Sequence, residues 1–252
     1  MIKAIMHGCT GRMGRVITDL VKEDPEIEIV SGVGMGDGSD LGYPVSESLD
    51  GIEANADVII DFSNAAAVEG LLSWAEERQI PVVLCTTGLS EEQLARVEES
   101  YQKLAVLRSA NMSLGINTLM ELLKIAAKIL SPAGFDIEIV EKHHNQKLDA
   151  PSGTAIALAD SINEAMDQEF DYIYDRSGRR QKRDKKELGI SAVRGGTIVG
   201  EHEIIFAGTD EVITFEHTAY SRAIFAKGAI SAAKYLAGKP AGHYDMSDVI
   251  KG

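Results

Sequence analysis

The stretch IKAIMHGCTGRMGRVITDLVKE, Ile2–Glu23, decides the fold. It begins as a short apolar run typical of a buried β-strand, turns through glycines at positions 8, 11 and 14, and continues as a helical pattern. Glycines at this spacing let the backbone turn tightly, approach a pyrophosphate and pack the helix on the strand. The stretch therefore predicts a strand–turn–helix unit whose helix N-terminus binds the phosphates of a dinucleotide.

The same rhythm continues beyond this unit as far as residue 111. Short apolar runs alternate there with helical patterns, and the runs occupy residues 2–8, 26–33, 56–63, 81–88 and 104–111. Strands separated by helices predict a parallel sheet, because parallel neighbours need a crossover connection. Ser90, followed three residues later by Gln93, predicts a capping box at the start of one of these helices.

The pattern changes after a longer helical stretch at residues 116–130. Strand-like segments joined by glycine-containing turns follow, which predicts an antiparallel or mixed sheet in a second domain. Residues 222–238 are helical again and could return to cover the first sheet. We therefore expect a first domain of residues 1–113 completed by 222–252, and a second domain of residues 114–221.

Composition excludes several classes of protein. The chain has 252 residues, is 44% hydrophobic and carries a formal net charge of −14, whereas phosphate-backbone binding needs a basic surface. We expect no nucleic-acid partner and, without a long apolar run or a signal-peptide pattern, no membrane partner and a cytoplasmic location. Cys9 and Cys85 are too few for a disulfide framework and lack metal-ligand spacing, so we expect reduced thiols and no metal site.

The end of the second predicted strand, SGVGMGDGSD, is where the adenine-side ribose is usually recognised. An acidic residue there favours NAD and a nearby cation favours NADP, but Gly34 and Met35 occupy the expected positions. Asp37 is the nearest acidic substitute, and Arg12 in the glycine turn is the close cation. We therefore expect both NADPH and NADH to support catalysis.

A second group of chemically active residues lies at EKHHNQKLDAPSGTA, residues 141–155. The preceding alternation predicts a strand that ends at His143 and His144, and two histidines alone would favour a structural or surface role. Lys147 adds a cation, and Ser152 is the predicted N-cap of a following helix whose first N–H groups attract an anion. Together they predict a carboxylate-binding site equipped for proton transfer.

The run RSGRRQKRDKKELG, residues 176–189, is strongly basic within an acidic protein. A charge run of this kind is usually a solvated loop. The functional alternative is a mobile cationic flap that attracts an anionic substrate.

Five segments together resemble the 4-hydroxy-tetrahydrodipicolinate reductase (dihydrodipicolinate reductase) family. They are GCTGRMG at 8–14, CTTG at 85–88, SANMSLGIN at 109–117, EKHHNQKLDAPSGTA at 141–155 and VRGGTIVGEHEIIFAGTDE at 193–211. The resemblance runs through both halves in the same order. It implies an α/β fold with a Rossmann-type doubly wound parallel sheet, and a second α+β domain that binds substrate and assembles a homotetramer through its open sheet.

The resemblance also implies an activity and the residues responsible for it. The activity is reduction of a cyclic imine dicarboxylate by NADPH or NADH in diaminopimelate and lysine biosynthesis. His143 would be the acid/base residue, and Lys147 a proton donor that also holds substrate. The other substrate-binding residues would be His144, Ser152, Gly153 and Thr154.

On the cofactor side, the resemblance implies two groups of contacts. The phosphate and ribose side would comprise Gly8, Cys9, Thr10, Gly11, Arg12, Met13 and Gly34. The nicotinamide side would comprise Cys85, Thr86, Thr87, Ser109, Ala110, Asn111 and Met112. Family members often have glycine where this chain has Cys85, which matters little if backbone groups make the contact.

Two alternatives compete with this interpretation. A different nicotinamide-dependent reductase of a small carboxylated substrate would explain the glycine turn but not the predicted dicarboxylate site. A non-enzymatic dinucleotide sensor acting on DNA is disfavoured by the acidic composition and the absence of a helix-turn-helix pattern.

Overall fold

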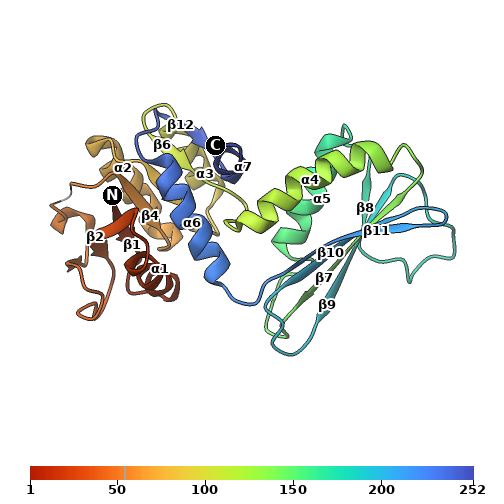
Figure 1. Ribbon diagram of the computed structural model, residues 1–252, viewed down its shortest axis with the longest axis horizontal. Helices are drawn as coiled ribbons and strands as arrows, with labels where there is room; N and C mark the ends of the chain where they lie inside the picture. Colours follow the sequence, from red (N-terminus) through yellow and green to blue (C-terminus); the bar gives the residue numbers. More distant parts are fainter. Residues whose placement is uncertain (54) are drawn as a thin grey trace. The chain divides into compact units, whose positions relative to one another are not determined.

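The computed structural model describes residues 1–53 and 55–252, which form two compact units (Figure 1). The first comprises Met1–Leu114 and Ala223–Gly252, and the second comprises Gly115–Arg222. The boundaries expected from the sequence, after residues 113 and 221, each lie one residue earlier. The second unit is thus an insertion into the first.

The first unit is built on a parallel sheet in the order β12-β6-β5-β4-β1-β2-β3, as the strand–helix alternation predicts. The strands are β1 (Ile2–His7), β2 (Ile27–Val33), β3 (Val45–Ser46), β4 (Val58–Asp61), β5 (Val82–Leu84), β6 (Ala105–Leu107) and β12 (Gly242–Tyr244). The chain moves from β1 outward to β2 and then crosses to β4 on the other side. This reversal of strand order creates a crevice at the carboxyl ends of β1 and β4, the usual place for a ligand in such sheets.

Helices cover both faces of this sheet. They are α1 (Arg12–Lys22), α2 (Val68–Arg78), α3 (Glu91–Ser100), α6 (Ala223–Leu236) and α7 (Met246–Lys251), with short 3-10 turns η1 (Leu49–Gly51) and η2 (Ala65–Ala67). Side chains of β1 alternate between two cores: Ala4 and Met6 pack with α1 and α6, whereas Ile5 packs with α2. The returning helix therefore covers the first sheet, and the predicted capping box of α3 is present.

The second unit contains a mixed five-stranded sheet in the order β11-β10-β7-β9-β8. Its strands are β7 (Asp136–His143), β8 (Asp171–Ile173), β9 (Glu187–Arg194), β10 (Glu201–Ala207) and β11 (Val212–Thr218), and its helices are α4 (Leu114–Leu130) and α5 (Gly153–Ala165). The central strand β7 pairs parallel with β9 and antiparallel with β10. Ile137 and Ile139 on one face of β7 enter a core with α4 and α5.

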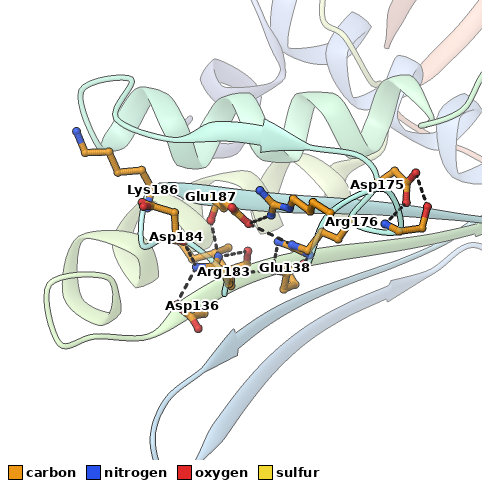
Figure 2. A network of polar contacts seen from close by, with 11 residues as sticks. Asp136, Glu138, Asp175, Arg176, Arg183, Asp184, Lys186 and Glu187 are labelled. Carbon is orange, nitrogen blue, oxygen red and sulfur yellow. Dashed lines mark hydrogen bonds and ion pairs between the residues drawn. The ribbon is translucent and has the colours of Figure 1, made fainter. Parts of the chain in front are cut away.

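The opposite face of β7 is polar and carries an arginine–carboxylate network (Figure 2). Arg176 donates two hydrogen bonds to the Glu138 carboxylate, at 2.9 and 2.7 Å, and Arg183 donates to Glu138 at 2.9 Å and to Asp136 at 2.8 Å. The basic run is therefore neither freely solvated nor an unattached flap. Its arginines fasten residues 176–183 to the sheet.

Glu187, the first residue of β9, extends this network. It accepts hydrogen bonds from Arg179 at 2.6 Å and from Arg176 at 3.1 Å. The hydrogen bond from Arg179 is the largest of the effects that lower the pKa of Glu187 to about 2. The carboxylate is consequently charged throughout the neutral range.

The sequence interpretation missed β3, β8, β12 and α7. Three of these are strands of two or three residues, and α7 has only six. β5 and β6 are as short as the missed strands but lie within longer apolar runs; outside such runs, segments this short show no recognisable hydrophobic period, so only tertiary pairing defines them. Among the described residues, no helix is long and apolar enough to cross a membrane.

Candidate active site

The carboxyl edge of the first sheet gathers the residues predicted to bind the cofactor. The turn at residues 8–11 follows β1, and Gly34 follows β2 directly. Residues 85–87 follow β5, and residues 109–112 come soon after β6. Because β1, β2, β5 and β6 are parallel members of one sheet, all four segments lie at the same edge.

The glycine turn packs closely against neighbouring backbone and leaves donors for a phosphate group. Gly8 has φ +86°, and a Cβ on it would lie 2.5 Å from the carbonyl oxygen of Phe62. A Cβ on Gly14 would lie 2.3 Å from the carbonyl oxygen of Gly8, so the helix can approach the turn only without a side chain there. Gly11 is the N-cap of α1 and provides no side-chain cap. The first N–H groups of α1 remain available to an anion, so the residues present fit a dinucleotide.

A cation that sequence position did not single out lies near the end of β2. Arg15 is one turn of α1 beyond Arg12, and its guanidinium donates to the Asp40 carboxylate at 2.5 Å and to the Asp37 carbonyl at 3.2 Å. The hydrogen bond from Arg15 lowers the pKa of Asp40. The helical period places residue i+3 on the same side as residue i, so the spacing of Arg12 and Arg15 was the signal that could have identified Arg15 from the sequence.

The residues after β5 differ in burial. Thr86 is buried, and its hydroxyl donates to the Asp61 carboxylate at 2.6 Å. Burial, reinforced by the negative charge of Asp61, raises the pKa of the Cys85 thiol well above its ordinary value. Cys85 is therefore a neutral thiol at physiological pH.

In the second unit, His143 is the last residue of β7 and is buried. Its Nδ1 lies 2.6 Å from the Glu141 carboxylate, which is fully buried. The two side chains share a face because they are two residues apart on a strand. His144 lies beyond the end of β7, so the pleat does not dictate where its ring points.

Glu141 is held from three directions. Arg194 makes a bidentate ion pair with it, both distances being 2.7 Å, and the Ser152 backbone N–H donates at 2.9 Å. Burial alone would raise the pKa of Glu141, but the hydrogen bonds from Arg194, His143 and Ser152 outweigh it and lower the pKa. An ionised Glu141 can only accept hydrogen bonds, so His143 carries its proton on Nδ1 toward Glu141 and leaves Nε2 as the other ring nitrogen.

Ser152 begins α5 and connects it to a second buried histidine. Its hydroxyl accepts from the Ala155 N–H at 3.1 Å, the predicted N-cap, and lies 3.0 Å from Nε2 of His202. Burial, and then the charge of His143, lowers the pKa of His202 to about 4. The ring of His202 lies edge-on to His143, with 5.2 Å between centroids. His202 is thus neutral beside the Glu141–His143 pair.

Space beside His143 depends on Gly200. A Cβ at this position would lie 3.0 Å from Nε2 of His143 and 3.4 Å from its Cδ2. Any larger residue would crowd the ring, because a contact of 3.0 Å is well inside the van der Waals separation. Gly200 is itself buried, so its missing side chain is what leaves room for the ring of His143.

The remaining predicted substrate residues surround the start of α5. Nζ of Lys147 lies 2.9 Å from the Asp149 carboxylate and lowers the pKa of that group. Gly153 and Thr154 form the first turn of α5. The buried Nδ1 of His144 has no hydrogen-bond partner among the described residues.

Sequence reasoning missed three residues of this arrangement. Glu141, Arg194 and His202 all lie within segments that carried the family resemblance, but none had been given a role. The two-residue spacing of Glu141 and His143 on a strand was a usable signal. Arg194 and His202 come from β9 and β10, so their approach depends on sheet register, which sequence spacing does not reveal.

The fold and these two groups of residues define a class of protein. A parallel doubly wound sheet with a glycine turn that fits a dinucleotide, joined to a unit with a buried Glu–His pair beside a helix N-terminus, is an oxidoreductase arrangement that uses a nicotinamide dinucleotide.

Comparison with known proteins narrows this class to one family. Residues 2–112 match the family model for the dihydrodipicolinate reductase N-terminus, and residues 115–250 match the model for its C-terminus. The 4-hydroxy-tetrahydrodipicolinate reductase of Caldanaerobacter subterraneus subsp. tengcongensis is 53% identical over 251 residues, covering 100% of this chain and 99% of that protein. That of Clostridium tetani is 48% identical, covering 98% and 96%. The chain belongs to the 4-hydroxy-tetrahydrodipicolinate reductase family.

A solved structure agrees at the level of fold. The dipicolinate-bound dihydrodipicolinate reductase of Paenisporosarcina sp. TG-14 superposes with a TM-score of 0.79 at 24% identity, covering 97% of each chain. The predicted family, the two-part α/β fold and the reductase class are thereby confirmed. The predicted nicotinamide dinucleotide is confirmed as a class of cofactor.

Proposed function

We propose that the protein reduces 4-hydroxy-tetrahydrodipicolinate, by way of the cyclic imine dihydrodipicolinate, to tetrahydrodipicolinate in diaminopimelate and lysine biosynthesis. The observation that carries this proposal is the buried Glu141–His143 pair, clamped by Arg194 beside the N-terminus of α5. A reduced nicotinamide supplies a hydride when bound. The chain must then supply a proton and two anion-binding positions.

His143 is the proposed proton donor. Glu141 accepts from Nδ1 and stabilises the charged ring, so the transferable proton is the one on Nε2. Arg194 keeps Glu141 ionised through its bidentate pair, and Gly200 leaves room for the ring at Nε2. Lys147 is the proposed second donor, and it also pairs with substrate.

The substrate carboxylates are assigned to the segment that follows. Lys147 exchanges its pairing with Asp149 for one carboxylate. The other is assigned to the first-turn N–H groups of α5, at Gly153 and Thr154, and to His144; the Gly153 N–H must then release the Asp149 carboxylate that it contacts. Ser152 caps this helix and contacts Glu141, so proton donor and anion site are fixed to one another.

Both NADPH and NADH are proposed as cofactors. Arg15 is the cation available for a 2′-phosphate, but Asp40 already pairs with it. A 2′-phosphate must displace Asp40, whereas the ribose of NADH leaves that pair intact. The competition limits the advantage of either cofactor.

A homotetramer assembled through the open face of the second unit's sheet is proposed as well. That face carries the partly buried Val140 and Ile205 together with Val193, which is 45% exposed. Among the described helices, only α4 and α5 contribute to the core of this unit. These apolar side chains alternate with charged ones across the open face, a mixture that suits a subunit contact.

The activity is tested by following oxidation of NADPH and NADH by purified protein, with and without freshly generated cyclic imine. We expect imine-dependent oxidation of both and none with an aldehyde panel. Absence of imine-dependent turnover with either cofactor would contradict the proposal. Turnover of the aldehydes alone would favour a different nicotinamide-dependent reductase.

A further inference from the structure

A buried hydrogen-bond relay lies beneath the cofactor edge of the first unit. Asp61, the last residue of β4, is fully buried. Its Oδ1 is 2.7 Å from Nδ1 of His7 and accepts from the Ser63 N–H at 3.2 Å, while its Oδ2 accepts from the Thr86 hydroxyl at 2.6 Å. His7 ends β1 immediately before the glycine turn. The relay thus joins three neighbouring strand ends.

The donors around Asp61 fix the direction of every bond. A backbone N–H can only donate, and an ionised carboxylate can only accept. The single hydroxyl hydrogen of Thr86 is therefore committed to Asp61. The hydroxyl of Ser63 lies 3.5 Å from Oγ1 of Thr86, a weak contact that leaves accepting capacity on the threonine oxygen.

We propose that His7 and Asp61 are positioning residues that force Thr86 to act as a hydrogen-bond acceptor toward the cofactor. The ligand group that matches an acceptor is the N–H₂ end of the nicotinamide carboxamide. His7 contributes by donating to Oδ1, which holds the carboxylate in the orientation that keeps Oδ2 on the Thr86 hydroxyl. This inference rests on the proposed function, because it takes residues 85–87 to border the nicotinamide.

The relay makes the site selective for the amide over the acid. The nicotinic-acid analogue of NADH carries a carboxylate in place of the carboxamide, so it has no N–H to donate to Thr86. Its negative charge would also lie close to the ionised Asp61. We expect NADH to bind at least about tenfold more tightly than this deamido analogue, the discrimination expected when a buried polar group is left unpaired.

Substitution of Asp61 by Asn should reverse the direction of the hydrogen bond between residue 61 and the Thr86 hydroxyl. The Ser63 N–H still requires an acceptor at the Oδ1 position, so the amide oxygen is held there. The amide N–H₂ then occupies the Oδ2 position and donates to Thr86. The threonine hydrogen is released outward, which favours the deamido analogue.

Three further substitutions separate the direction of the hydrogen bonds from side-chain packing. Thr86→Val removes the hydroxyl at nearly constant volume. The ratio of NADH affinity to deamido-NADH affinity should then fall toward one without dropping below it. His7→Asn keeps a donor for Asp61 and should retain most of the preference, whereas His7→Leu removes the donor and should lose part of it.

The test is calorimetric titration of wild type and variants with NADH, deamido-NADH and ADP-ribose, which lacks the nicotinamide. We expect ADP-ribose affinity to stay within about twofold throughout, while the NADH to deamido-NADH ratio falls by about tenfold or more in Asp61→Asn and by a smaller factor in Thr86→Val. Equal binding of the two analogues by wild type would overturn the inference, as would an unchanged ratio in Thr86→Val. If Asp61→Asn does not fold, the affinity ratio measured for Thr86→Val decides whether the inference stands.

Failure of the proposed function is recognised separately. Intact NADH selectivity without turnover of the cyclic imine would contradict the proposed reaction and leave the relay standing. Loss of all dinucleotide binding in wild type would contradict both.

Discussion

At the scale of single residues, the proposed chemistry depends on how buried charges are paired. Glu141 has no access to solvent, yet it is held in its charged form by Arg194 and by two other donors. A buried carboxylate without such partners would instead become protonated. Asp61 is also fully buried, and its carboxylate oxygens are satisfied by His7, the Ser63 N–H and the Thr86 hydroxyl.

His143→Gln should lower kcat by about 10²–10⁴-fold, the usual loss when a general acid is removed. Cofactor affinity should change little, because His143 belongs to the second unit. Steady-state kinetics and NADH titration measure the two effects. The matched control is His243→Gln, an exposed ring stacked on Tyr101, which should leave kcat within about twofold. Near-normal kcat in folded His143→Gln would assign the proton to another group.

The Arg15–Asp40 pair gives a test of cofactor preference. In the wild type, kcat/KM for NADPH and NADH should differ by less than roughly a hundredfold, about 2.7 kcal/mol. Arg15→Ala should lower kcat/KM for NADPH by about tenfold relative to NADH, and Asp40→Asn should shift preference toward NADPH by freeing the guanidinium. Steady-state kinetics with each cofactor measures both. A native preference far above a hundredfold, or no shift in either variant, would place ribose recognition elsewhere.

An acid at position 34 is a poorer test of the same question. A Cβ on Gly34 would lie 2.6 Å from Oγ1 of Thr10 and 3.0 Å from Sγ of Cys9. An acidic side chain there would displace the glycine turn as well as add charge, so its two effects could not be separated. Asp40 is not among these contacts of Gly34, so its substitution is the cleaner test.

His202 makes stability depend on pH. Its pKa is about 4 in the folded protein against an ordinary value of 6.5, so between these values the unfolded chain binds a proton that the folded chain does not. The free energy of unfolding should therefore fall, by about 1–3 kcal/mol, as the pH drops from 6.5 to 4. His202→Gln should have a shallower pH dependence in urea unfolding, whereas His243→Gln should keep the wild-type slope. An unchanged slope in His202→Gln would refute the assignment.

At the scale of elements, the long strands and helices could be predicted because each repeats a hydrophobic period several times. The alternation around Ile137 and Ile139 gave β7, and the Ser90–Gln93 pair gave the start of α3. Contacts between strands could not be predicted. Arg194 reaches Glu141 only because β9 lies beside β7 in a particular register, and the arginines of the basic run meet Glu138 only after that sheet has formed.

Gly189 in β9 leaves the space that the Glu138–Arg176 ion pair occupies. A Cβ at this strand position would lie 1.9 Å from Oε2 of Glu138 and 2.9 Å from Nη1 of Arg176. Both atoms are held by their mutual ion pair, so Gly189→Ala should break the network and lower the free energy of unfolding by about 1–3 kcal/mol.

Chemical denaturation measures the loss at Gly189. The control is Gly178→Ala in the loop that precedes β9, where a Cβ meets nothing within 4 Å; it should change stability by no more than about 0.5 kcal/mol. Equal effects in the two variants would mean that the network does not constrain Gly189.

At the scale of the whole molecule, the proposed assembly can be measured directly. Light scattering after size exclusion should give a mass of four copies of the 27.2 kDa chain. Val140→Arg adds a bulky cation to the open sheet face, opposite Glu203, and should release smaller species. Gln102→Arg, on the exposed surface of the first unit, should not. A monomeric wild type would remove the proposed tetramer.

The insertion of the second unit into the first also has a consequence for biosynthesis. The ribosome completes residues 1–114 early, but α6 and β12, which finish that sheet and one of its two cores, are among the last segments made. Until they emerge, Val83 and Leu107 lack the helix that buries them in the finished protein. The nascent N-terminal half therefore exposes a hydrophobic sheet face throughout translation of the insert, which makes it a natural client for chaperones that shield unfinished chains.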